Sequence, residues 1–386
     1  MHGTRKAARG LARYTAAALL AAAAATLAGC AHGSSDVRGG PTTGPVGCPA
    51  AHAKAQTAVE RAEKTDMPWD GPTNGPGAVP GKNIVFVAQT MTNPGVAGAA
   101  KGVREAARVI GWKIRVIDGG GTPAGIQAAM SQAVTLKPSG IVIGGFDPDS
   151  TSQQVARADA QRIPLVGWHA LAAPGPSRRP PLFTNVTTRV EDVAAISAQW
   201  IIADSDGHAG VVLITDASIP FAKDKSELIR KQLATCPSVR LLAYENIPIA
   251  DASSRTPREV SSLLSRFRSR WTHSVAINDL YFADAAPAFR AAGRKGSGPP
   301  FNIGAGDGDP SAFQRIETRQ YQAATVPEPL ALQGWQIVDE FNRAYAGRPA
   351  SGYVAPVHLA TAANSDATTS WDPPGYREGY RRIWGR

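Results

Sequence analysis

From residue 83 onward, short apolar runs alternate with longer stretches in which apolar residues recur every three or four positions. The first runs are rich in Ile and Val and lie at 84–87, 114–117, 141–143 and 165–167. Such short, continuous runs are typical of strands buried on both faces of a parallel sheet. The helical patterns between them cover 96–110, 124–136 and 151–161. Strand, helix and strand in this order predict βαβ units with right-handed crossovers.

The same alternation begins again near residue 190. Strands are expected at 211–214, 241–243, 275–277 and 302–304, with helices at 190–203, 223–234, 258–268 and 282–292. One further amphipathic helix is expected at 330–346, followed by a strand at 357–359. Two successive sets of βαβ units predict an α/β protein with two lobes, each a doubly wound parallel sheet.

Polar and aromatic residues follow these strands. In open parallel sheets, ligands bind beyond the carboxyl ends of the strands, and two such lobes share a cleft that hinge closure can shut. A mixture of rings and hydrogen-bonding groups suits ligands with many hydroxyl groups. The candidate ligand-binding residues are Asn93, Phe146, Asp147, Trp168, His169, Phe221, Lys225, Asn278, Asp307 and Glu328.

Short motifs along the chain resemble the sugar-type periplasmic binding proteins, the class that includes ribose and galactose receptors of ABC importers. The first motif is Asn93-Pro94 after the first strand, with Gly102 and Gly111 further along. The later matches are Gly140-Ile141-Val142-Ile143, Ile163-Pro164-Leu165-Val166, Ile277-Asn278-Asp279, Gly306-Asp307-Gly308 and Ala324-Thr325-Val326. The order and spacing of these motifs, from about residue 82 to residue 364, carry the resemblance.

The resemblance implies a type I periplasmic binding protein fold, in which a three-stranded hinge joins two lobes. Lobe 1 would hold 82–184 and 328–356, and lobe 2 would hold 185–327 and 357–363. The implied protein captures a small polyhydroxylated solute, a sugar, between its lobes. It delivers this ligand to an ABC permease with a cytoplasmic ATPase. It would be a monomer with no cofactor and no enzymatic activity.

Four site residues carry over from the family motifs. Asn93 corresponds to an amide that binds sugar hydroxyls, and Asn278 and Asp307 correspond to polar contacts from lobe 2. Glu328 stands where ribose-type receptors usually carry Gln, so a charged acceptor is expected there. Two simpler interpretations stay open: Asp307 also fits a turn after a strand, and Asp279 also fits a helix N-cap.

Other positions depart from the family pattern. Gly95 and Val96 stand where aromatic residues often flank the sugar ring, and His169-Ala170 replaces a common Asp-Arg pair. An expected Arg is absent, and Lys223 or Lys225 is the nearest cation. The site therefore differs from a ribose site.

Three aromatic residues are candidates for a replacement stacking surface, namely Phe146, Trp168 and Phe221. Trp168 and His169 also fit structural roles at the hinge and at a strand end. Trp335 and His358 are expected to be structural.

The first thirty residues have the pattern of an export signal. Four bases at the start (Arg5, Lys6, Arg9 and Arg13) precede an apolar stretch at 15–27 that is short for a membrane span. Leu27-Ala28-Gly29-Cys30 then resembles a lipobox, in which Cys30 receives the lipid. An ordinary signal peptide or a short anchor helix is the alternative. We expect a protein anchored by lipid to a bacterial membrane, on its periplasmic or cell-surface face, with a signal peptide at 1–29.

Two regions outside the lobes are expected to be linkers. Residues 30–81 would form a tether with a short helix at 50–64, and residues 364–386 would form a C-terminal tail. The two remaining cysteines are Cys48 in the tether and Cys236 in the folded part. Export permits a disulfide between them, and two separate thiols fit the sequence nearly as well. No His or further Cys stands at metal-ligand spacing from either one.

Enzyme motifs are absent from the sequence. It holds no Gly-x-Ser-x-Gly, His-Glu-x-x-His or Walker loop, and the acidic runs at Asp147 and Asp307 lack the Gly and Glu of a calcium loop. A sugar-responsive transcription regulator of this fold is excluded, because residues 31–81 hold no helix-turn-helix. A receptor of the same fold that presents its solute to a chemoreceptor or sensor kinase remains the alternative function.

The net charge of +10 does not indicate a nucleic acid partner. Four of the 41 basic residues lie in the signal, which leaves 37 basic residues against 31 acidic ones in the mature chain. The remaining basic residues are scattered along the chain and form no aromatic-interleaved nucleic-acid motif. A modest positive charge on a tethered protein is consistent with proximity to anionic lipid.

Overall fold

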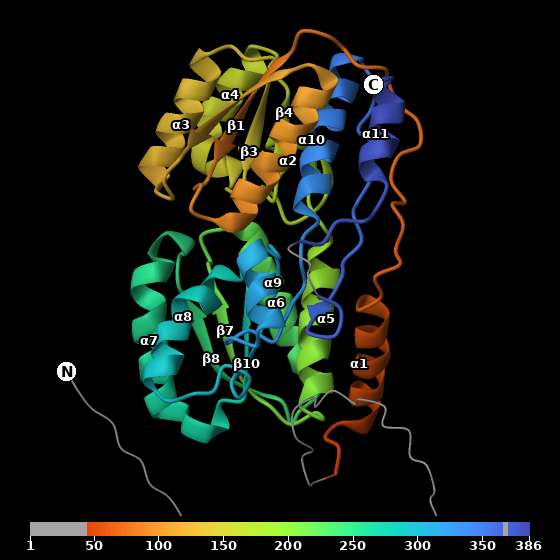
Figure 1. Cartoon of the computed structure of the whole chain (residues 1–386). Helices are drawn as coiled ribbons and strands as arrows, with labels where there is room; N and C mark the ends of the chain where they lie inside the picture. The colour runs from red at the N-terminus through yellow and green to blue at the C-terminus, as the bar shows by residue number, and fades with distance from the viewer. Residues whose placement is uncertain (1–44, 366–369) are drawn as a thin grey trace, which may run out of the picture. The chain divides into compact units, whose positions relative to one another are not determined.

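The apolar runs form two six-stranded sheets in a computed structural model of the chain. The structure describes residues 45–365 and 370–386, which all lie in one unit. Sheet A has the strand order β2-β1-β3-β4-β6-β5, and sheet B has the order β12-β11-β10-β9-β7-β8. Helices cover both faces of each sheet, and each sheet with its helices forms one lobe (Figure 1). The predicted fold class, two doubly wound α/β lobes, is confirmed.

Lobe 1 is built on sheet A. Its strands are β1 (Asn83–Ala88), β2 (Lys113–Asp118), β3 (Gly140–Gly144), β4 (Leu165–Trp168), β5 (Gly175–Arg178) and β6 (Pro181–Val186). Its helices are α2 (Pro94–Ile110), α3 (Pro123–Thr135), η1 (Pro148–Thr151), α4 (Ser152–Ala160), α10 (Leu330–Tyr345) and α11 (Tyr376–Trp384). The pairs of β1 with β2 and β3, of β3 with β4, and of β4 with β6 are parallel.

Lobe 2 is built on sheet B. Its strands are β7 (Gly210–Thr215), β8 (Arg240–Asn246), β9 (His273–Ala276), β10 (Phe301–Gly304), β11 (Ala324–Thr325) and β12 (Ala360–Thr361). Its helices are α1 (Pro49–Ala62), α5 (Val190–Asp204), α6 (Pro220–Leu233), η2 (Ile249–Asp251), α7 (Ala252–Phe267), η3 (Arg268–Arg270), α8 (Leu280–Ala291) and α9 (Pro310–Glu317). β12 pairs antiparallel with β11 at one edge.

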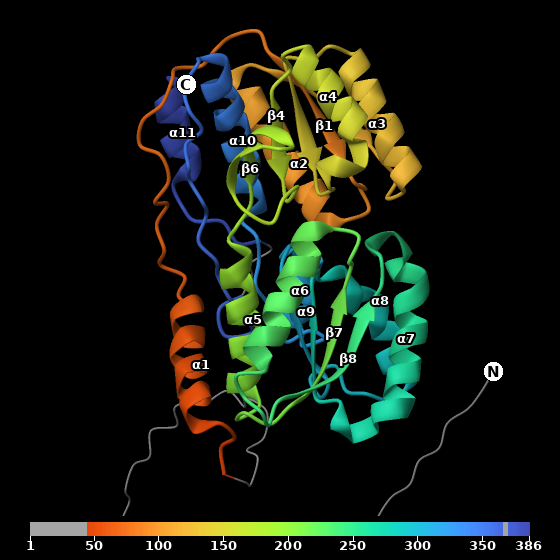
Figure 2. The ribbon, with the colours of Figure 1, turned by 180° about the vertical axis from the view of Figure 1, so that it is seen from behind.

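The pleat of β1 divides its apolar residues between two cores. Ile84 and Phe86 pack with α2, α10 and α11 on one face of sheet A, and Val85 and Val87 pack with α3 and α4 on the other. Successive side chains of a strand point to opposite faces, so burial on both faces requires an unbroken apolar run. Sheet B divides its side chains in the same way, with α1, α5 and α6 on one face and α7 and α8 on the other (Figure 2).

Several elements differ from the sequence-based expectation. The strand expected at 357–359 is wrong, because the pairing falls on the next two residues, Ala360 and Thr361, which form β12. The β5–β6 pair, α9 and β11 are further elements that the pattern did not indicate. Each of the missed strands is short or lies toward a sheet edge, where the apolar signal is weak.

The two expected linker regions contain helices that belong to the lobes. Ala55, Val59 and Ala62 of α1 are buried against lobe 2, because they form one stripe at helical spacing. The C-terminal helix α11 likewise buries Tyr376 and Tyr380 in the core of lobe 1. The short helix expected at 50–64 is present as α1, and α11 packs on lobe 1 within the region expected to be a tail.

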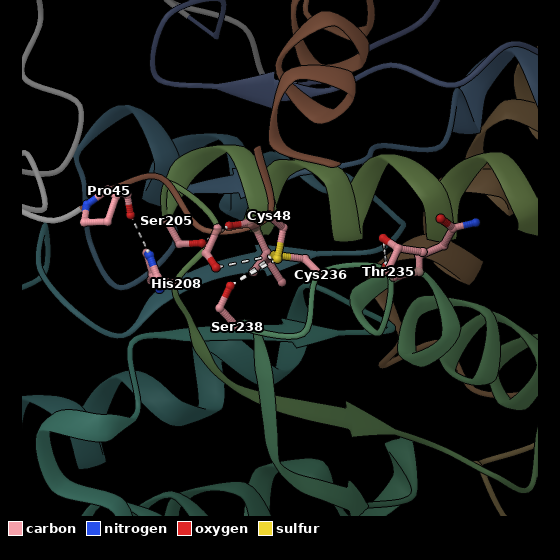
Figure 3. The surroundings of a disulfide bond; sticks show 10 residues. Pro45, Cys48, Ser205, His208, Thr235, Cys236 and Ser238 are labelled. Carbon is pink, nitrogen blue, oxygen red and sulfur yellow. Dashed lines mark hydrogen bonds between the residues drawn. A yellow bond between two sulfur atoms is a disulfide. The ribbon is translucent and has the colours of Figure 1, made fainter. Parts of the chain in front are cut away.

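A disulfide joins Cys48 to Cys236, with the Cα atoms 5.3 Å apart (Figure 3). The sequence left this pairing open. Packing of α1 on α5 brings Cys48, the residue before α1, next to the loop after α6. The disulfide therefore fastens the start of the described chain to lobe 2.

The signal peptide expected at 1–29 and the lipidation site at Cys30 lie outside the described residues. Within residues 45–365 and 370–386, no helix has the length and apolar character needed to cross a membrane.

Candidate functional site

The strand ends of both lobes contribute residues to one buried cluster. Asn93 begins α2 after β1, Asn278 follows β9, and Asp307 follows β10. The Asn278 Nδ2 atom donates to Asn93 Oδ1 at 3.2 Å and also to Asp307 Oδ2. All three side chains are at least nine-tenths buried. One amide group therefore connects lobe 1 to a carboxylate of lobe 2.

The loop backbone places these groups. Asn93 Oδ1 also accepts from the Gly95 backbone N–H at 3.0 Å, which caps α2, and Asn278 Oδ1 caps α8 through the Leu280 N–H at 2.9 Å. Asp307 has a φ of 72°, a left-handed conformation that Asp and Asn tolerate better than most residues. A Cβ atom on Gly95 would lie 2.4 Å from Asp307 Oδ1. Glycine at position 95 is what allows Asp307 to approach the start of α2.

Three aromatic rings form a stack beside this cluster. The His169 ring lies 4.1 Å from Trp168 at an interplanar angle of 6°, and 4.4 Å from Phe221 at 27°. Trp168 and His169 come from lobe 1 and Phe221 comes from α6 of lobe 2, so this stack also joins the lobes. Because His169 has a φ of 48°, its backbone turns left-handed directly after β4. That turn sets the imidazole between the other two rings.

Glu328 lies at the centre of a hydrogen-bonded chain on the segment between β11 and α10. Its Oε1 accepts from Thr188 Oγ1 at 2.8 Å, and its Oε2 accepts from Gln333 Nε2 at 2.7 Å. Gln333 Oε1 in turn accepts from the Trp168 indole N–H at 2.7 Å. His169 Nε2 lies 3.6 Å from Glu328 Oε2. The ring stack is therefore fixed in place by a carboxylate on a segment that links the lobes.

The pKa values of two carboxyl groups in the site, Asp307 and Glu328, are shifted in opposite directions. Burial raises the pKa of Asp307 well above its usual value, and the neighbouring Asp279 raises it further. Burial alone would also raise the pKa of Glu328, but His169, Lys225 and Thr188 together outweigh it, so the pKa of Glu328 is lowered. Asp307 is therefore the carboxyl group that protonates more readily, and Glu328 is the one that stays ionised.

Lys225 is buried beside the Phe221 ring and the loops that follow β9 and β10. Its Nζ donates to the backbone carbonyl groups of Ile277 at 3.1 Å and of Ala305, and it lies 4.8 Å from the centre of the Phe221 ring. Burial lowers the pKa of Lys225. The ammonium group holds together the loops that follow β9 and β10, so these contacts give Lys225 a positioning role.

Asp279 supports the loop that carries Asp307. Its carboxylate accepts from the Gly308 N–H at 2.7 Å, from Thr325 Oγ1 at 3.1 Å and from Gln322 Nε2. Asp279 occupies the N-cap position of α8, as expected, but its side chain makes no cap hydrogen bond, and the Leu280 N–H donates to Asn278 Oδ1 instead. Burial raises the pKa of Asp279 to about 7.

Two predicted site residues lie elsewhere. Phe146 packs in the core of lobe 1 with Val87 and Met130, so it does not contribute to the ring stack. The half-buried Asp147 caps η1 by accepting from the Asp149 N–H at 2.9 Å. Trp335 and His358 are buried, as expected for structural residues.

Sequence reasoning missed Thr188, Gln333 and the close approach at Gly95. Thr188 follows β6, a strand that the sequence pattern did not indicate, and Gln333 lies within helix α10. They reach the site because the chain passes between the lobes beside them. The one available signal was their position near the expected hinge segments at 185 and 328.

The chain belongs to the periplasmic binding protein domain family, whose model matches residues 84–349. A comparison with curated proteins found no match. The match to this family confirms the resemblance inferred from the sequence.

Solved structures of solute-binding proteins have the same fold. A glucose-galactose binding protein from Geobacillus stearothermophilus is 16% identical, with a TM-score of 0.63, and the match covers 73% of this chain and 98% of that one. A sugar ABC transporter protein from Yersinia enterocolitica is 16% identical, with a TM-score of 0.64 and coverage of 90% and 95%. An Agrobacterium vitis solute-binding protein bound to α-D-tagatopyranose is 13% identical, with a TM-score of 0.66 and coverage of 76% and 100%. At these identities the likeness shows the fold.

Proposed function

We propose that this protein is the solute-binding component of an ABC importer. It captures one small polyhydroxylated solute, a sugar, between its lobes and delivers it unchanged to a permease with a cytoplasmic ATPase. Membership of the periplasmic binding protein family supports the solute-binding part. The choice of a sugar as the ligand rests on one observation. The ring stack of Trp168, His169 and Phe221 lies beside amide and carboxylate groups from both lobes.

A sugar has apolar ring faces and a rim of hydroxyl groups, and each hydroxyl both donates and accepts. The Asn278 amide donates, Glu328 accepts, and Asp307 accepts and, when protonated, also donates. Buried polar atoms without a hydrogen-bond partner cost free energy, and three of them lie among the residues that follow β1, β4 and β6: Gln89 Oε1, His169 Nε2 and Thr187 Oγ1. A bound solute would satisfy such atoms. Two structural neighbours, the glucose-galactose binding protein and the protein bound to α-D-tagatopyranose, agree with this ligand class.

Closure of the lobes is the proposed binding step. In the described structure the lobes meet through the Asn93–Asn278 hydrogen bond and the His169–Phe221 stack. A solute that contacts both lobes favours the closed form by the difference between its affinities for the closed and open forms. The permease would then recognise the surfaces of both lobes in that form.

Attachment to the membrane is the second part of the proposal. Cys30 would carry the lipid, and the mature chain would lie on the periplasmic or cell-surface face of a bacterial membrane. The Cys48–Cys236 disulfide supports an oxidising compartment. Labelled palmitate should enter the wild-type protein in a bacterial host and fail to enter Cys30→Ala, and failure of both to take up label would contradict the anchor.

A thermal-shift screen tests the ligand class. The panel would hold pentoses, hexoses, polyols and their phosphorylated derivatives, and at least one unphosphorylated sugar or polyol should raise the melting temperature. Titration calorimetry should then show weaker binding for Asp307→Asn, a substitution that keeps the left-handed backbone, and unchanged binding for the exposed Asp224→Asn. Equal affinity in both variants would contradict the site.

A further inference from the structure

The end of lobe 2 remote from the candidate site is formed by five loops that follow helices. In a βαβ unit each helix returns the chain to the amino ends of the strands, opposite to the ligand edge. The loops at this end are 204–210, 234–240, 266–272, 290–300 and 317–323 (Figures 1 and 2).

Backbone and side-chain hydrogen bonds join these loops to one another. The Arg240 N–H donates to the Ala209 carbonyl at 2.7 Å, and the Thr272 N–H donates to the Gly210 carbonyl at 3.0 Å. The Arg294 guanidinium donates to the Arg268 carbonyl at 3.2 Å. The Tyr321 N–H donates to the Gly296 carbonyl at 2.9 Å. The five loops therefore form one continuous surface, which we name the basic pole.

Positive charge dominates the basic pole. The five loops carry eight basic residues, namely Arg240, Arg266, Arg268, Arg270, Arg290, Arg294, Lys295 and Arg319. They carry three acidic residues, Asp204, Asp206 and Glu317. Asp204 lies 3.1 Å from His273 and Asp206 lies 3.5 Å from His52, so two of the three acids already face an imidazole. Arg294 is half-buried and the other seven basic residues are exposed.

Aromatic rings support several of these side chains. The guanidinium groups of Arg266 and Arg270 lie 4.8 Å and 5.6 Å from the centre of the Phe267 ring. Arg290 lies 5.9 Å from the centre of the Tyr321 ring. Such packing holds the side-chain stems on the protein while the charges face outward.

The N-terminal segment joins the molecule at this same end. The Pro45 carbonyl lies 3.0 Å from His208 Nε2, and the Gly47 N–H donates to the Asp206 carbonyl at 2.9 Å. Figure 3 shows the disulfide from Cys48 to Cys236, which lies in the loop at 234–240. Pro45 stands fifteen residues after Cys30, a distance of at most about 50 Å even in a fully extended chain.

We propose that the basic pole binds the anionic phospholipid headgroups of the membrane to which the protein is anchored. This inference rests on the lipid anchor of the proposed function, which brings the pole to the bilayer. A lipid anchor alone is a single point of attachment and sets no orientation. Clustered Lys and Arg add an attraction that acts within a Debye length of about 8 Å at physiological salt. The strand ends that carry Asn278 and Asp307 then point away from the bilayer.

Arginine footprinting of the full chain in vesicles tests the proposal. The lipidated protein is placed in vesicles of phosphatidylcholine alone, or of two parts phosphatidylcholine and one part phosphatidylglycerol. Phenylglyoxal modification is then mapped by mass spectrometry. Arg266, Arg268 and Arg270 should react several-fold more slowly in the anionic vesicles, and about 1 M salt, where the Debye length is about 3 Å, should remove the difference. The exposed Arg104 and Arg108 of lobe 1 should react equally in both.

Equal reaction rates of the pole arginines in the two lipids would overturn the proposal. This is also the result expected if the pole binds another acidic macromolecule and not lipid. Protection that persists in high salt would also overturn it. Flotation with pure phosphatidylcholine vesicles measures the anchor separately, so loss of the anchor and loss of the pole contact are distinguishable.

A pair of charge-reversal variants provides the matched control. Binding to anionic vesicles, measured by flotation, should be weaker for Arg266→Glu/Arg268→Glu/Arg270→Glu than for the wild type, and the difference should decrease as salt is added. It should not weaken for Lys101→Glu/Arg104→Glu/Arg108→Glu on the exposed face of α2. Equal weakening in the two triple variants would overturn the proposal. If the first variant fails to fold, the footprint of the wild-type protein decides alone.

Discussion

The side-chain nitrogen of Asn278 on lobe 2 lies 3.2 Å from the side-chain oxygen of Asn93 on lobe 1. The same amide group donates to Asp307, so one residue links a helix cap of one lobe to a carboxylate of the other. Hydroxyl groups of a solute can replace either partner, because they both donate and accept. Asn278 is therefore the residue at which we expect ligand capture and lobe closure to be coupled.

Asn278→Ser should weaken ligand binding by roughly 2- to 10-fold, since a hydrogen bond between uncharged groups contributes roughly 0.5–1.5 kcal/mol. The serine hydroxyl can still cap α8 in place of Asn278 Oδ1, but it is too short to reach Asn93. Calorimetry with the strongest ligand from the screen measures the affinity, and a melting curve checks the cap. Wild-type affinity in Asn278→Ser would show that this amide does not contact the ligand.

Gly95→Ala should hinder closure while leaving each lobe folded. The added Cβ atom would lie 2.4 Å from Asp307 Oδ1, much closer than a van der Waals contact. Affinity should fall and small-angle scattering should show a larger radius of gyration. Gly77→Ala is the control, because no heavy atom lies within 4 Å of a Cβ atom placed there. If Gly95→Ala binds as well as Gly77→Ala, the lobes do not close as described.

Removal of the Cys48–Cys236 disulfide should lower the free energy of unfolding by about 2–4 kcal/mol, because the bond closes a loop between residues 188 apart. The variant is Cys48→Ser/Cys236→Ala, with alanine at the buried position. Urea unfolding measures the change, and dithiothreitol should destabilise the wild type but not the variant. Sensitivity of both proteins to dithiothreitol would argue against the disulfide.

Stability should depend on pH through Asp279. Its pKa is raised from 3.8 to about 7 by burial, so between these values the native state holds a proton that the unfolded chain releases. The free energy of unfolding should therefore fall as pH rises through this window. Asp279→Asn removes the titration, and urea unfolding at about pH 4 and about pH 8 should show a flatter profile for the variant. Parallel profiles would contradict the raised pKa.

Most of the fold could be predicted because buried parallel strands appear as unbroken apolar runs. The run at 84–87 became β1 and the run at 211–214 became β7, each extended by one or two residues. β12 is two residues long and could not be placed from a pattern. Helix α11 had a readable stripe at Tyr376, Tyr380 and Trp384, so calling it a tail overlooked a visible signal.

The candidate site was partly predictable for a related reason. Asn93, Asn278 and Asp307 each follow a strand, and parallel strands bring such positions to one edge. Phe146 follows a strand as well, but its side chain turns into the core of lobe 1. Thr188 and Gln333 depend on how the chain passes between the lobes, and no local pattern specifies that path.

Calorimetric titration of the wild type, Asp307→Asn and Asp224→Asn with the strongest sugar or polyol from the thermal-shift screen tests ligand capture between the lobes most directly. We predict one binding site in the wild type, the same affinity in Asp224→Asn, and at least 10-fold weaker binding in Asp307→Asn. Unchanged affinity in Asp307→Asn, or no stabilising ligand among the sugars and polyols, would contradict it.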